Sequence, residues 1–338
     1  RDLEANATIL DGQNERRVLY QESEFNVLTE WNGFTLQNGR TNGNGGGAYL
    51  NSNGKLNQCI IKKNIAYRGG GVYAGWSSTV ISNCLISNNS ASNNGGGIFS
   101  HYHATIQNTT IVRNIASNGS GVYGNYGINL TNCIVWGNGN NNVSGNLTSS
   151  YSAIRAPVFE EGNISLDDVC NRPMFVNPSL TPGVSDTTAN VDWHLQQGSV
   201  CINRGNNNAV TDSMDLSGIA RIQRDTVDMG CYESNFYSNT TSTLPIVTTL
   251  QISDTTATSA VCGGTVTMGC GDSIITRGVC WSTEPNPTIN DQSTVDGTGV
   301  GSFTSSLNGL TGGTTYYIRA YATNSVGTSY GEEVVFTT

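Results

Sequence analysis

The sequence predicts an all-β protein, a parallel β-helix followed by a β-sandwich, and three observations support this prediction. Only 12% of the 338 residues are charged, and Gly and Asn are abundant in their place. A unit of about 25 residues recurs along the first half of the chain. Short stretches of alternating apolar and polar residues lie between Asn/Gly turns, and no long helical pattern interrupts them.

The repeated unit has two signatures. Glycine blocks recur at 45–47, 69–71, 95–97 and 119–121. A second signature ends in Asn and recurs at 59–64, 84–89, 109–114 and 133–138, with 33–38 as a weaker first copy. The scarcity of Leu excludes leucine-rich repeats, and the strand-like alternation excludes helical repeats. A period of this length therefore predicts a β-solenoid whose coils stack at about 4.8 Å.

Three positions of the unit have predicted roles. The closing residues Asn38, Asn64, Asn89, Asn114 and Asn138 should tolerate left-handed turns and hydrogen-bond to the Asn one coil away. Glycine suits the sharp bends, where side chains are forbidden. The residues that begin the signature should stack inside the solenoid, where the thiols would be mostly unreactive; they are Cys59, Cys84, Thr109 and Cys133.

The alternation also predicts an apolar strip on the outside of the coils, formed by Phe34, Ile60, Leu85, Thr110 and Ile134. A solvated outer strand should be polar there, and a patch this large is seldom left bare. We expect the irregular segment 150–200 to cover the strip, and a neighbouring molecule is the alternative. The apolar residues available in that segment are Tyr151, Ile154, Val158, Phe159, Met174 and Phe175.

A family resemblance rests on these residues. The apolar-x-x-Asn signature (Ile61 to Asn64, Ile86 to Asn89, Ile111 to Asn114), alternating with Gly-Gly-x-aliphatic, resembles the repeats of polymorphic outer-membrane proteins and related bacterial surface β-helices. The stretches 192–206 (DWHLQQGSVCINRGN) and 221–234 (RIQRDTVDMGCYES) resemble the end of choice-of-anchor β-helix domains of secreted Bacteroidetes proteins. The resemblance covers about residues 1–235. It implies a right-handed β-helix at the cell surface or beyond, with repeats over about 33–140, a closing segment over about 150–235 and no particular catalytic activity.

A second module is expected after a polar linker at 236–245. Residues 246–338 contain about seven short strands, as a β-sandwich requires. Leu310 and Thr314-Thr315-Tyr316, leading into the strand 317–321, resemble the tyrosine corner of fibronectin type III domains. Trp281 is expected in the core of this fibronectin type III-like sandwich.

The distribution of charge argues against catalysis on the coils. Residues 31–159 contain no Asp or Glu, whereas glycoside hydrolases need a pair of carboxylates and calcium-assisted lyases need clustered acids. We interpret Asp212, Asp215, Asp225 and Asp228 as turn and cap acids. The net charge of −9 is unlike that of a general nucleic-acid binder, and no apolar run approaches the length of a membrane span.

No metal site or cofactor is expected either. His101 and His103 would share one face of a strand. A metal site needs a third or fourth ligand, and none is visible nearby. We therefore expect an exposed pair of histidines without a metal.

The aromatic residues provide a candidate binding surface. Tyr49, Tyr73, Phe99 and Tyr123 occupy one position in four successive coils, each after an aliphatic residue, and Trp76 lies near one edge. If the aliphatic residues point inward, the rings form an outward strip. Such a strip could bind the flat faces of sugars, or the rings could simply stack and stiffen the outer face, and we favour the second reading.

Covalent links and modifications are also predicted. An exported protein allows disulfides, and the candidate pairs are Cys201–Cys231 and Cys262–Cys270. Asp-Ser/Thr-apolar triplets that resemble Bacteroidetes O-glycosylation sites place Ser213, Thr226, Thr255 and Ser273 as candidate acceptors.

Two classes of function remain. The first is a non-catalytic structural or adhesive protein, secreted or at the bacterial cell surface, whose partners would be glycans, other surface proteins or further copies of itself. The alternative is a β-helix that binds or degrades polysaccharides. The absence of acids from the repeat zone favours the first class.

Overall fold

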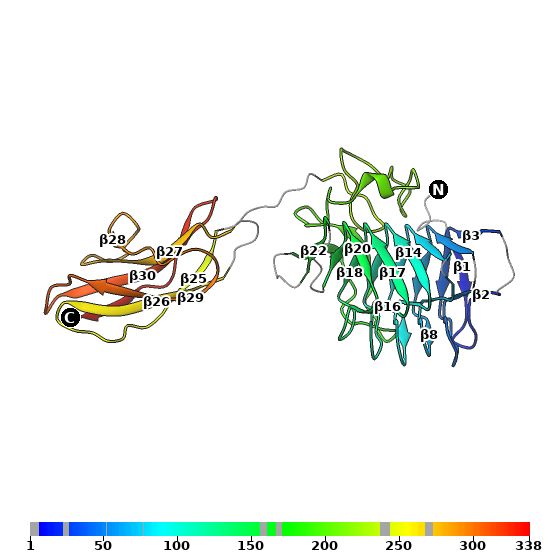
Figure 1. The fold of residues 1–338 in the computed structure, drawn as a ribbon, viewed down its shortest axis with the longest axis horizontal. Coiled ribbons are helices and arrows are strands. Elements are labelled where there is room, and N and C mark those ends of the chain that lie inside the picture. The colour runs from blue at the N-terminus through cyan, green and yellow to red at the C-terminus, as the bar shows by residue number, and fades with distance from the viewer. Residues whose placement is uncertain are drawn as a thin grey trace. The chain divides into compact units, whose positions relative to one another are not determined.

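The chain is described from a computed structural model, which covers residues 7–22, 27–51, 53–76, 78–155, 161–166, 171–236, 244–267 and 273–338. It divides into two compact units, Arg1–Asn239 and Thr240–Thr338. The division lies within the stretch predicted as a linker. Each unit is all-β (Figure 1), and the described part of the chain contains one short 3₁₀ helix, η1 (Asn207–Ala209).

The first unit is a parallel β-solenoid of about five turns, as predicted. In the described residues, three long sheets run along it. Sheet 1 comprises β1 (Thr8–Asp11), β4 (Phe34–Gln37), β7 (Ile60–Lys62), β11 (Leu85–Ser87), β15 (Thr110–Val112), β18 (Ile134–Trp136), β21 (Ala153–Ile154) and β22 (Ile164–Ser165). Sheet 2 comprises β2 (Leu19–Gln21), β5 (Ala48–Leu50), β9 (Val72–Ala74), β13 (Ile98–Ser100), β16 (Val122–Gly124) and β19 (Val143–Gly145). Sheet 3 comprises β3 (Thr29–Asn32), β6 (Gly54–Asn57), β10 (Val80–Ser82), β14 (His103–Gln107), β17 (Gly127–Thr131) and β20 (Thr148–Ser150).

Two smaller pairs of strands complete the first unit. The parallel pair β8 (Ile65–Ala66) and β12 (Ser90–Ala91) lies in the turns between sheets 1 and 2. The antiparallel pair β23 (Phe175–Asn177) and β24 (Asp192–Leu195) belongs to the closing segment, the name used below for residues 171–236.

The interior of the solenoid is built from side chains stacked in register. In sheet 1 the inward stack consists of Leu36, Ile61, Ile86, Ile111, Val135 and Ile154, all buried. The predicted stack of Cys59, Cys84, Thr109 and Cys133 is also buried, with 0% exposure at each residue. The Cys59 N–H lies 3.4 Å from Cys84 Sγ, and the Cys84 N–H donates to Thr109 Oγ1 at 3.3 Å. This part of the prediction is confirmed.

The predicted Asn ladder is present and continuous. In each bond the side-chain Nδ2 of one Asn donates to Oδ1 of the next Asn in the ladder. The four bonds are Asn64 to Asn89 (2.9 Å), Asn89 to Asn114 (2.9 Å), Asn114 to Asn138 (3.0 Å) and Asn138 to Asn142 (3.0 Å). The same amides bond to backbone carbonyls of the preceding coil, so buried polar groups at this corner are satisfied.

The left-handed conformation, however, lies one residue before the ladder. Lys63, Asn88 and Arg113 have φ of 57°, 56° and 56°. Of the five closing Asn residues predicted to tolerate this conformation, Asn38 alone has it (φ 53°), and for the four Asn of the ladder the prediction was wrong.

Glycine recurs in these blocks because side chains are disfavoured at most of their positions, although Ser120 occupies the middle of the last block. Gly95 has φ of 67°, a conformation that favours glycine. A Cβ on Gly96 would lie 2.4 Å from Ser120 O and 2.5 Å from Ile115 O. The chain therefore turns sharply while its backbone packs against the next coil.

The first copy of the signature is shifted by one residue from the predicted alignment. Thr35, not Phe34, pairs with Ile60. Phe34 packs against the interior core instead of the outside. A slip of one residue exchanges the two faces of a strand, so Gly39 takes the ladder position, and its N–H donates to Asn64 Oδ1 at 2.7 Å.

The outward apolar strip of sheet 1 is covered by the same chain, as predicted. The strip consists of Thr35, Ile60, Leu85, Thr110, Ile134 and Ala153. A second apolar core joins Leu85, Ile134 and Ala153 to residues of the closing segment. The buried residues of that segment in this core are Phe175, Trp193, Leu195, Cys201, Ile202, Leu216, Met229, Cys231 and Tyr232.

Most of the residues predicted to form the cover do not do so. Phe175 does, but Ile154 points into the solenoid and Met174 is 44% exposed. Tyr151 is half-buried and its hydroxyl donates to Glu161 at 2.7 Å. Val158 and Phe159 lie outside the described residues. The cover comes mainly from residues after 190, where no periodic pattern indicates which side chains are buried.

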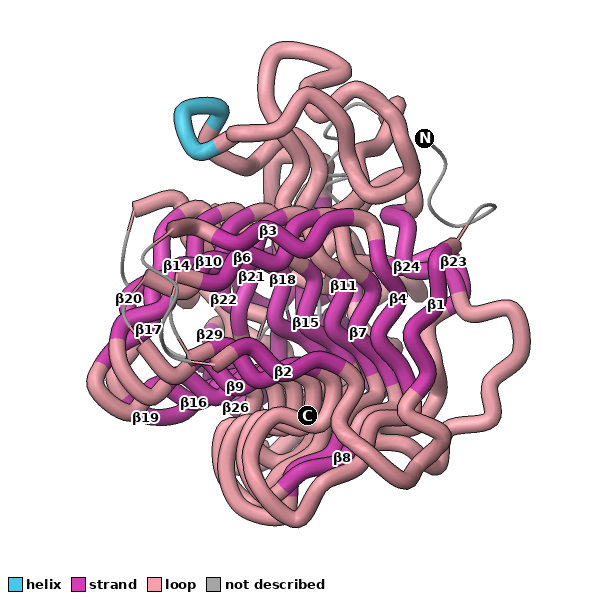
Figure 2. Tube along the Cα trace, turned by 90° about the vertical axis from the view of Figure 1, so that its right-hand side faces the viewer, coloured by secondary structure: helices cyan, strands magenta, loops and turns pink. Residues whose placement is uncertain are grey.

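Hydrogen bonds fix the closing segment at both corners of sheet 1. At the corner with sheet 3, Asn83 Nδ2 donates to Asp212 Oδ2 at 2.6 Å and Asn132 accepts from the Asn206 N–H at 2.7 Å. At the other corner, Asn88 Nδ2 donates to Thr181 O at 3.1 Å. Figure 2 shows the loops of this segment outside the coils, with η1 at the top of the view.

The second unit consists of two antiparallel sheets in its described residues. One sheet contains β25 (Ile246–Thr249), β26 (Ser259–Thr267) and β29 (Gly301–Asn308). The other contains β28 (Gln292–Ser293), β27 (Thr276–Ser282), β30 (Thr315–Thr323), β31 (Thr328–Tyr330) and β32 (Val334–Thr337). Trp281 is 7% exposed and belongs to the core, as predicted.

Replacing Leu85 with Asp should destabilise the first unit, because the carboxylate would lie unpaired in the core beneath the closing segment. We expect a loss of about 4 kcal/mol in unfolding free energy, measured by urea denaturation. Asn129→Asp, which places the same carboxylate on an exposed outward position of β17, should have little effect. Equal stability of the two variants would contradict the observed cover.

Asn114→Asp tests the ladder at constant size. The carboxylate cannot donate to Asn138 Oδ1 or Ile86 O as the amide does, so we expect a loss of about 3 kcal/mol. Asn118→Asp is the matched control, because Asn118 bonds to its neighbour Asn94 at the exposed surface. The measurement is again the urea midpoint, and similar values for both variants would show that the buried ladder adds nothing to stability.

Candidate functional site

The predicted aromatic strip exists as a continuous stack, here called the inner ladder. It comprises Tyr20, Tyr49, Tyr73, Phe99 and Tyr123 on sheet 2. Ring centroids lie 5.1, 4.9, 5.3 and 5.4 Å apart in that order. Tyr20 extends the strip by one coil and was not predicted, although it follows the aliphatic Leu19 as the other rings follow theirs.

The central rings of the inner ladder present little surface to a ligand, whereas Tyr20 at its end is 53% exposed. Tyr73 is 7% exposed and Phe99 is 2% exposed. Their faces stack on one another, and the Arg68 guanidinium lies 5.4 Å from the Phe99 centroid. Arg17 lies in the same way over Tyr20 and Tyr49. This geometry agrees with the stiffening role favoured above.

A second aromatic row lies in the turns that follow sheet 2, here called the outer row. Trp76, Tyr102 and Tyr126 stack with centroids 5.2 and 5.4 Å apart. They are 47%, 36% and 59% exposed. Trp76 was predicted at the edge of the strip, whereas Tyr102 and Tyr126 were missed. The sequence feature that could have identified them is their position, because each of the three rings lies two residues after the end of a sheet 2 strand.

The two histidines do not share a strand. His101 lies in the turn after β13, and His103 begins β14. Within the part of the chain that the structure describes, no cluster of three or more His, Cys, Asp or Glu could hold a metal ion. The ring of His101 instead packs edge-on against Tyr102 and Tyr126.

A groove of about 690 Å³ lies between sheet 1 and the closing segment. Its floor is the part of the outward strip nearest the N-terminus, Thr35, Ile60 and Leu85. The closing segment lines the groove with Asp192, His194 and Tyr232. The ring centroids of His194 and Tyr232 are 4.1 Å apart, and His194 Nδ1 is 2.7 Å from Asp192 Oδ1.

Opposite charges balance around this groove. Lys62 and Lys63 line it together with Asp186 and Asp192. Asp186 accepts hydrogen bonds from Thr181 and Thr188, and Asp192 accepts from His194. The carboxylates are therefore engaged with their own segment.

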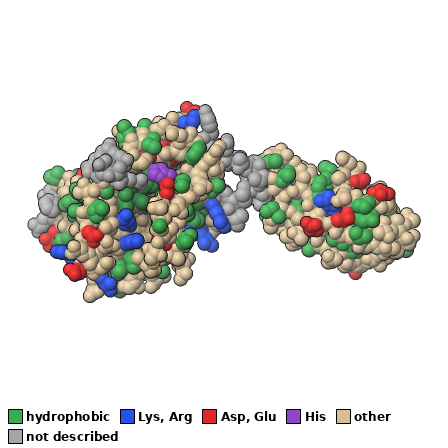
Figure 3. Space-filling view, turned by 180° about the vertical axis from the view of Figure 1, so that it is seen from behind, with side chains coloured by type: hydrophobic (Ala, Val, Ile, Leu, Met, Phe, Trp, Pro, Cys, Tyr) green, Lys and Arg blue, Asp and Glu red, His purple; other side chains and the backbone are tan. Residues whose placement is uncertain are grey.

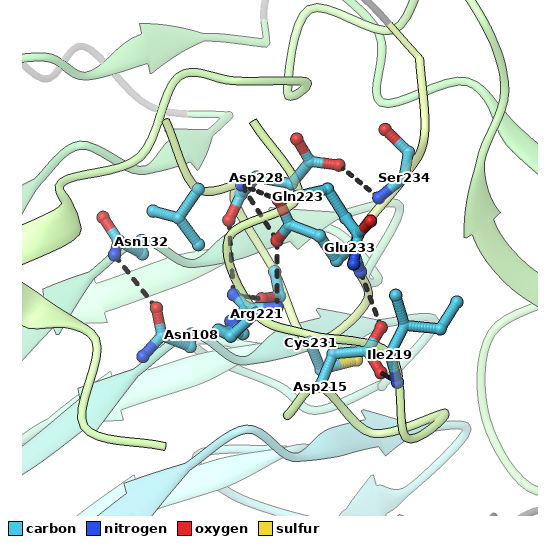
Figure 4. A network of polar contacts seen from close by, with 12 residues as sticks. Asn108, Asn132, Asp215, Ile219, Arg221, Gln223, Asp228, Cys231, Glu233 and Ser234 are labelled. Atoms are coloured by element: carbon cyan, nitrogen blue, oxygen red, sulfur yellow. Dashed lines mark hydrogen bonds and ion pairs between the residues drawn. The ribbon is translucent and has the colours of Figure 1, made fainter. Parts of the chain in front are cut away.

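The closing segment has a buried polar network (Figure 4). Arg221 is 1% exposed, donates to Asp228 O at 3.2 Å and to Gly230 O, and lies 3.8 Å from Glu233 Oε2. The Asp228 carboxylate accepts from the N–H groups of Asn203 (2.7 Å) and Ser234 (2.8 Å).

Glu233 is linked to the remaining acid of the network. Its N–H donates to Asp215 Oδ2 at 2.8 Å. Asp215 also accepts from the N–H groups of Ser217 and Ile219. The interpretation of Asp215 and Asp228 as cap acids agrees with these contacts.

Burial determines the protonation of this network. It raises the pKa of Glu233 to about 8, to which the nearby Asp228 adds, and it raises the pKa of Asp228. Paired, perturbed carboxylates are typical of active sites. Here, however, both residues are buried, with Asp228 0% exposed and Glu233 3% exposed. Their carboxylates accept hydrogen bonds from backbone N–H groups of the closing segment.

The predicted Cys201–Cys231 disulfide is absent from the structure. Both residues are buried free thiols, and burial raises the pKa of each, that of Cys231 to about 12. The two stretches do meet, since the Met229 N–H donates to Cys201 O at 3.0 Å. Cys231 lies two residues further on, where its N–H donates to Thr110 Oγ1 of sheet 1 at 3.1 Å.

The other covalent predictions have separate outcomes. Cys262 is a buried free thiol, and its predicted partner Cys270 lies outside the described residues. Of the candidate O-glycosylation sites, Ser213, Thr255 and Ser273 are exposed and Thr226 is half-buried. Glycosylation of these residues stays a prediction.

The surface is sparsely charged. On the face of each unit seen in Figure 3, Lys, Arg, Asp and Glu side chains occupy a small part of the surface, among tan atoms and scattered hydrophobic side chains. Among the described residues, no helix has the length and apolar character needed to cross a membrane.

Comparison with known proteins gives few relatives. No family model and no curated protein matches the chain. Among solved structures, it resembles the sensor domain of the anti-sigma factor RsgI4 of Pseudobacteroides cellulosolvens, with 21% identity over 28% of this chain and 95% of that one, and a TM-score of 0.23. It also resembles the sixth fibronectin type III domain of human fibronectin type III domain containing protein 3, with 24% identity over 26% and 78% of the two chains and a TM-score of 0.20.

A third solved structure, described as a myokine, is 21% identical over 29% of this chain and 98% of that one, with a TM-score of 0.21. At TM-scores this low, the likenesses carry no argument about the role of the chain.

The buried network should make the first unit less stable as pH rises. Because the pKa of Glu233 is raised from 4.5 to about 8, the unfolded state loses this proton at lower pH than the folded state. The unfolding free energy should therefore fall from about pH 4.5 to pH 8 and then level off. Asp228, whose pKa is also raised, adds a fall of the same sign.

Glu233→Gln should weaken the pH dependence of the unfolding free energy, because an amide does not titrate. The charged groups that face residue 233 are Arg221, Asp228 and Asp215. The measurement is the urea midpoint at pH 5, 7 and 9, with exposed Glu161→Gln as the control. A steep fall that persists unchanged in Glu233→Gln would assign the effect to other groups.

Proposed function

We propose that this chain is a non-catalytic bacterial protein, secreted or at the cell surface, whose right-handed β-helix is a stiff rod that meets partners through its sides. The observation that carries this proposal is the unbroken Asn ladder from Asn64 to Asn142, which joins successive coils through buried hydrogen bonds. The inner ladder of stacked rings joins the same coils on another side.

The distribution of carboxylates supports a non-catalytic role. A glycoside hydrolase needs two carboxyl groups that flank an accessible sugar. Asp228 and Glu233 are buried in the network of the closing segment. Asp186 and Asp192 border the groove but accept hydrogen bonds from their own segment.

The second unit fits a fibronectin type III-like module carried by the rod. The Thr311 N–H donates to the Tyr316 hydroxyl at 3.1 Å, which is the backbone contact of a tyrosine corner. Trp281 lies in the core between antiparallel sheets, as in such modules. We infer that the closing segment is the choice-of-anchor type of ending, and that export follows from this family.

An assay of polysaccharide breakdown tests the proposal. The chain is incubated with neutral and acidic polysaccharides, and new reducing ends and unsaturated uronates are measured. We expect no product from any of them. Product formation that is lost in Asp186→Asn or Asp192→Asn, but kept in the exposed control Asp254→Asn, would overturn the non-catalytic role and locate a reaction in the groove.

A further inference from the structure

The outer row differs from the inner ladder in what it offers to a partner. Its rings are 36–59% exposed, whereas the central rings of the inner ladder are 2–7% exposed. Single exposed aromatic residues are ordinary on a protein surface. Three in line, at one position of successive coils, form a continuous aromatic surface along the solenoid.

The outer row is held rigidly before any partner binds. Trp76, Tyr102 and Tyr126 stack on one another, and the His101 centroid lies 4.7 Å from Tyr102 and 5.7 Å from Tyr126. The backbone of this turn is fixed as well, because the Tyr126 N–H donates to His101 O at 3.2 Å. A rigid aromatic surface loses little conformational entropy on binding.

The chemistry of the row selects the kind of partner. Its rings supply apolar edges, and the tyrosine hydroxyls supply donors and acceptors beside them. None of its three side chains carries a formal charge at neutral pH. His101 Nδ1 is 3.4 Å from Asn125 Nδ2, which adds further polar groups at the margin.

The row is a single line of three rings, and this shape favours a narrow partner over a broad one. A standard protein interface buries about 800 Å² on each partner, around an apolar centre, and three partly exposed rings in a single line are narrower than this. A linear polymer with a short repeat fits better, because the aromatic groups recur once per coil, with centroids 5.2 and 5.4 Å apart.

We propose that the outer row of Trp76, Tyr102 and Tyr126 binds a neutral polysaccharide whose chain runs along the solenoid axis. This proposal rests on the proposed function and names the partner that one side of the rod meets. The sugar rings would lie in van der Waals contact with the exposed parts of the three aromatic rings, and the sugar hydroxyls would bond to the tyrosine hydroxyls and to the margin at His101 and Asn125.

The test is native affinity electrophoresis of the full chain in gels that contain hydroxyethyl cellulose, xyloglucan or galactomannan, beside gels with polygalacturonate or alginate. We expect at least one neutral polysaccharide to retard the chain and the acidic ones to have no such effect. Trp76→Ala and Tyr126→Ala should each weaken the retention about tenfold, which corresponds to about 1.4 kcal/mol. Each variant loses one ring contact with Tyr102, so its urea midpoint should fall only slightly and show that the first unit is still folded.

Tyr67→Ala is the matched control, because Tyr67 is 43% exposed on another turn of the same solenoid. It should leave the retention unchanged. The proposal is overturned if none of the neutral polysaccharides retards the chain, if only acidic ones do, or if the outer-row variants bind as well as the Tyr67 variant. A polysaccharide that is shortened during the experiment contradicts the non-catalytic role instead, whichever residues bind it.

Discussion

Each strand residue of the solenoid lies beside its counterpart in the next coil, and this constraint governs the rest of the first unit. At a coil spacing of about 4.8 Å, a side chain must tolerate its neighbour: amides bond, rings stack and aliphatic groups pack, but like charges repel. Lys62 accordingly lies between Gln37 and Ser87 in register. Lys55 lies opposite Glu30, its ion-pair partner at 3.4 Å. The coils accordingly contain few charged residues, and residues 31–159 contain no Asp or Glu.

The same constraint explains how far the fold could be predicted. When successive coils stack in register, residues at the same position of the repeat lie beside one another. The buried stack of Cys59, Cys84 and Cys133 could therefore be predicted by aligning the repeats. The first copy lacks the initial Cys, and alignment on its final Asn placed Phe34 on the wrong face. The closing segment has no period, so its sequence indicates apolar content but not that Trp193 and Tyr232 are the residues buried against sheet 1.

The candidate site shows a similar limit. Alternation within a strand predicts that Tyr73 and Phe99 point outward, and they do. It does not predict their burial, which depends on side chains from other turns, such as Arg68. Tyr102 lies between two histidines and was passed over because that stretch was interpreted as a histidine pair. Comparison of the turns after each sheet 2 strand would have found it, since Trp76 occupies the same position one coil earlier.

Charged residues can lie close together in the closing segment because its residues are not stacked on equivalent residues of a neighbouring coil. Like charges are therefore not forced into register there. Arg221, Asp228 and Glu233 form the buried polar centre of the segment. Glu233 and Asp228, whose pKa values are raised by burial, lie in this cover, while the Asn amides that join the coils do not titrate. A rise in pH that ionises Glu233 therefore places a charge inside the segment that covers the outward apolar strip. The stacked coils beneath keep the bonds that define the rod.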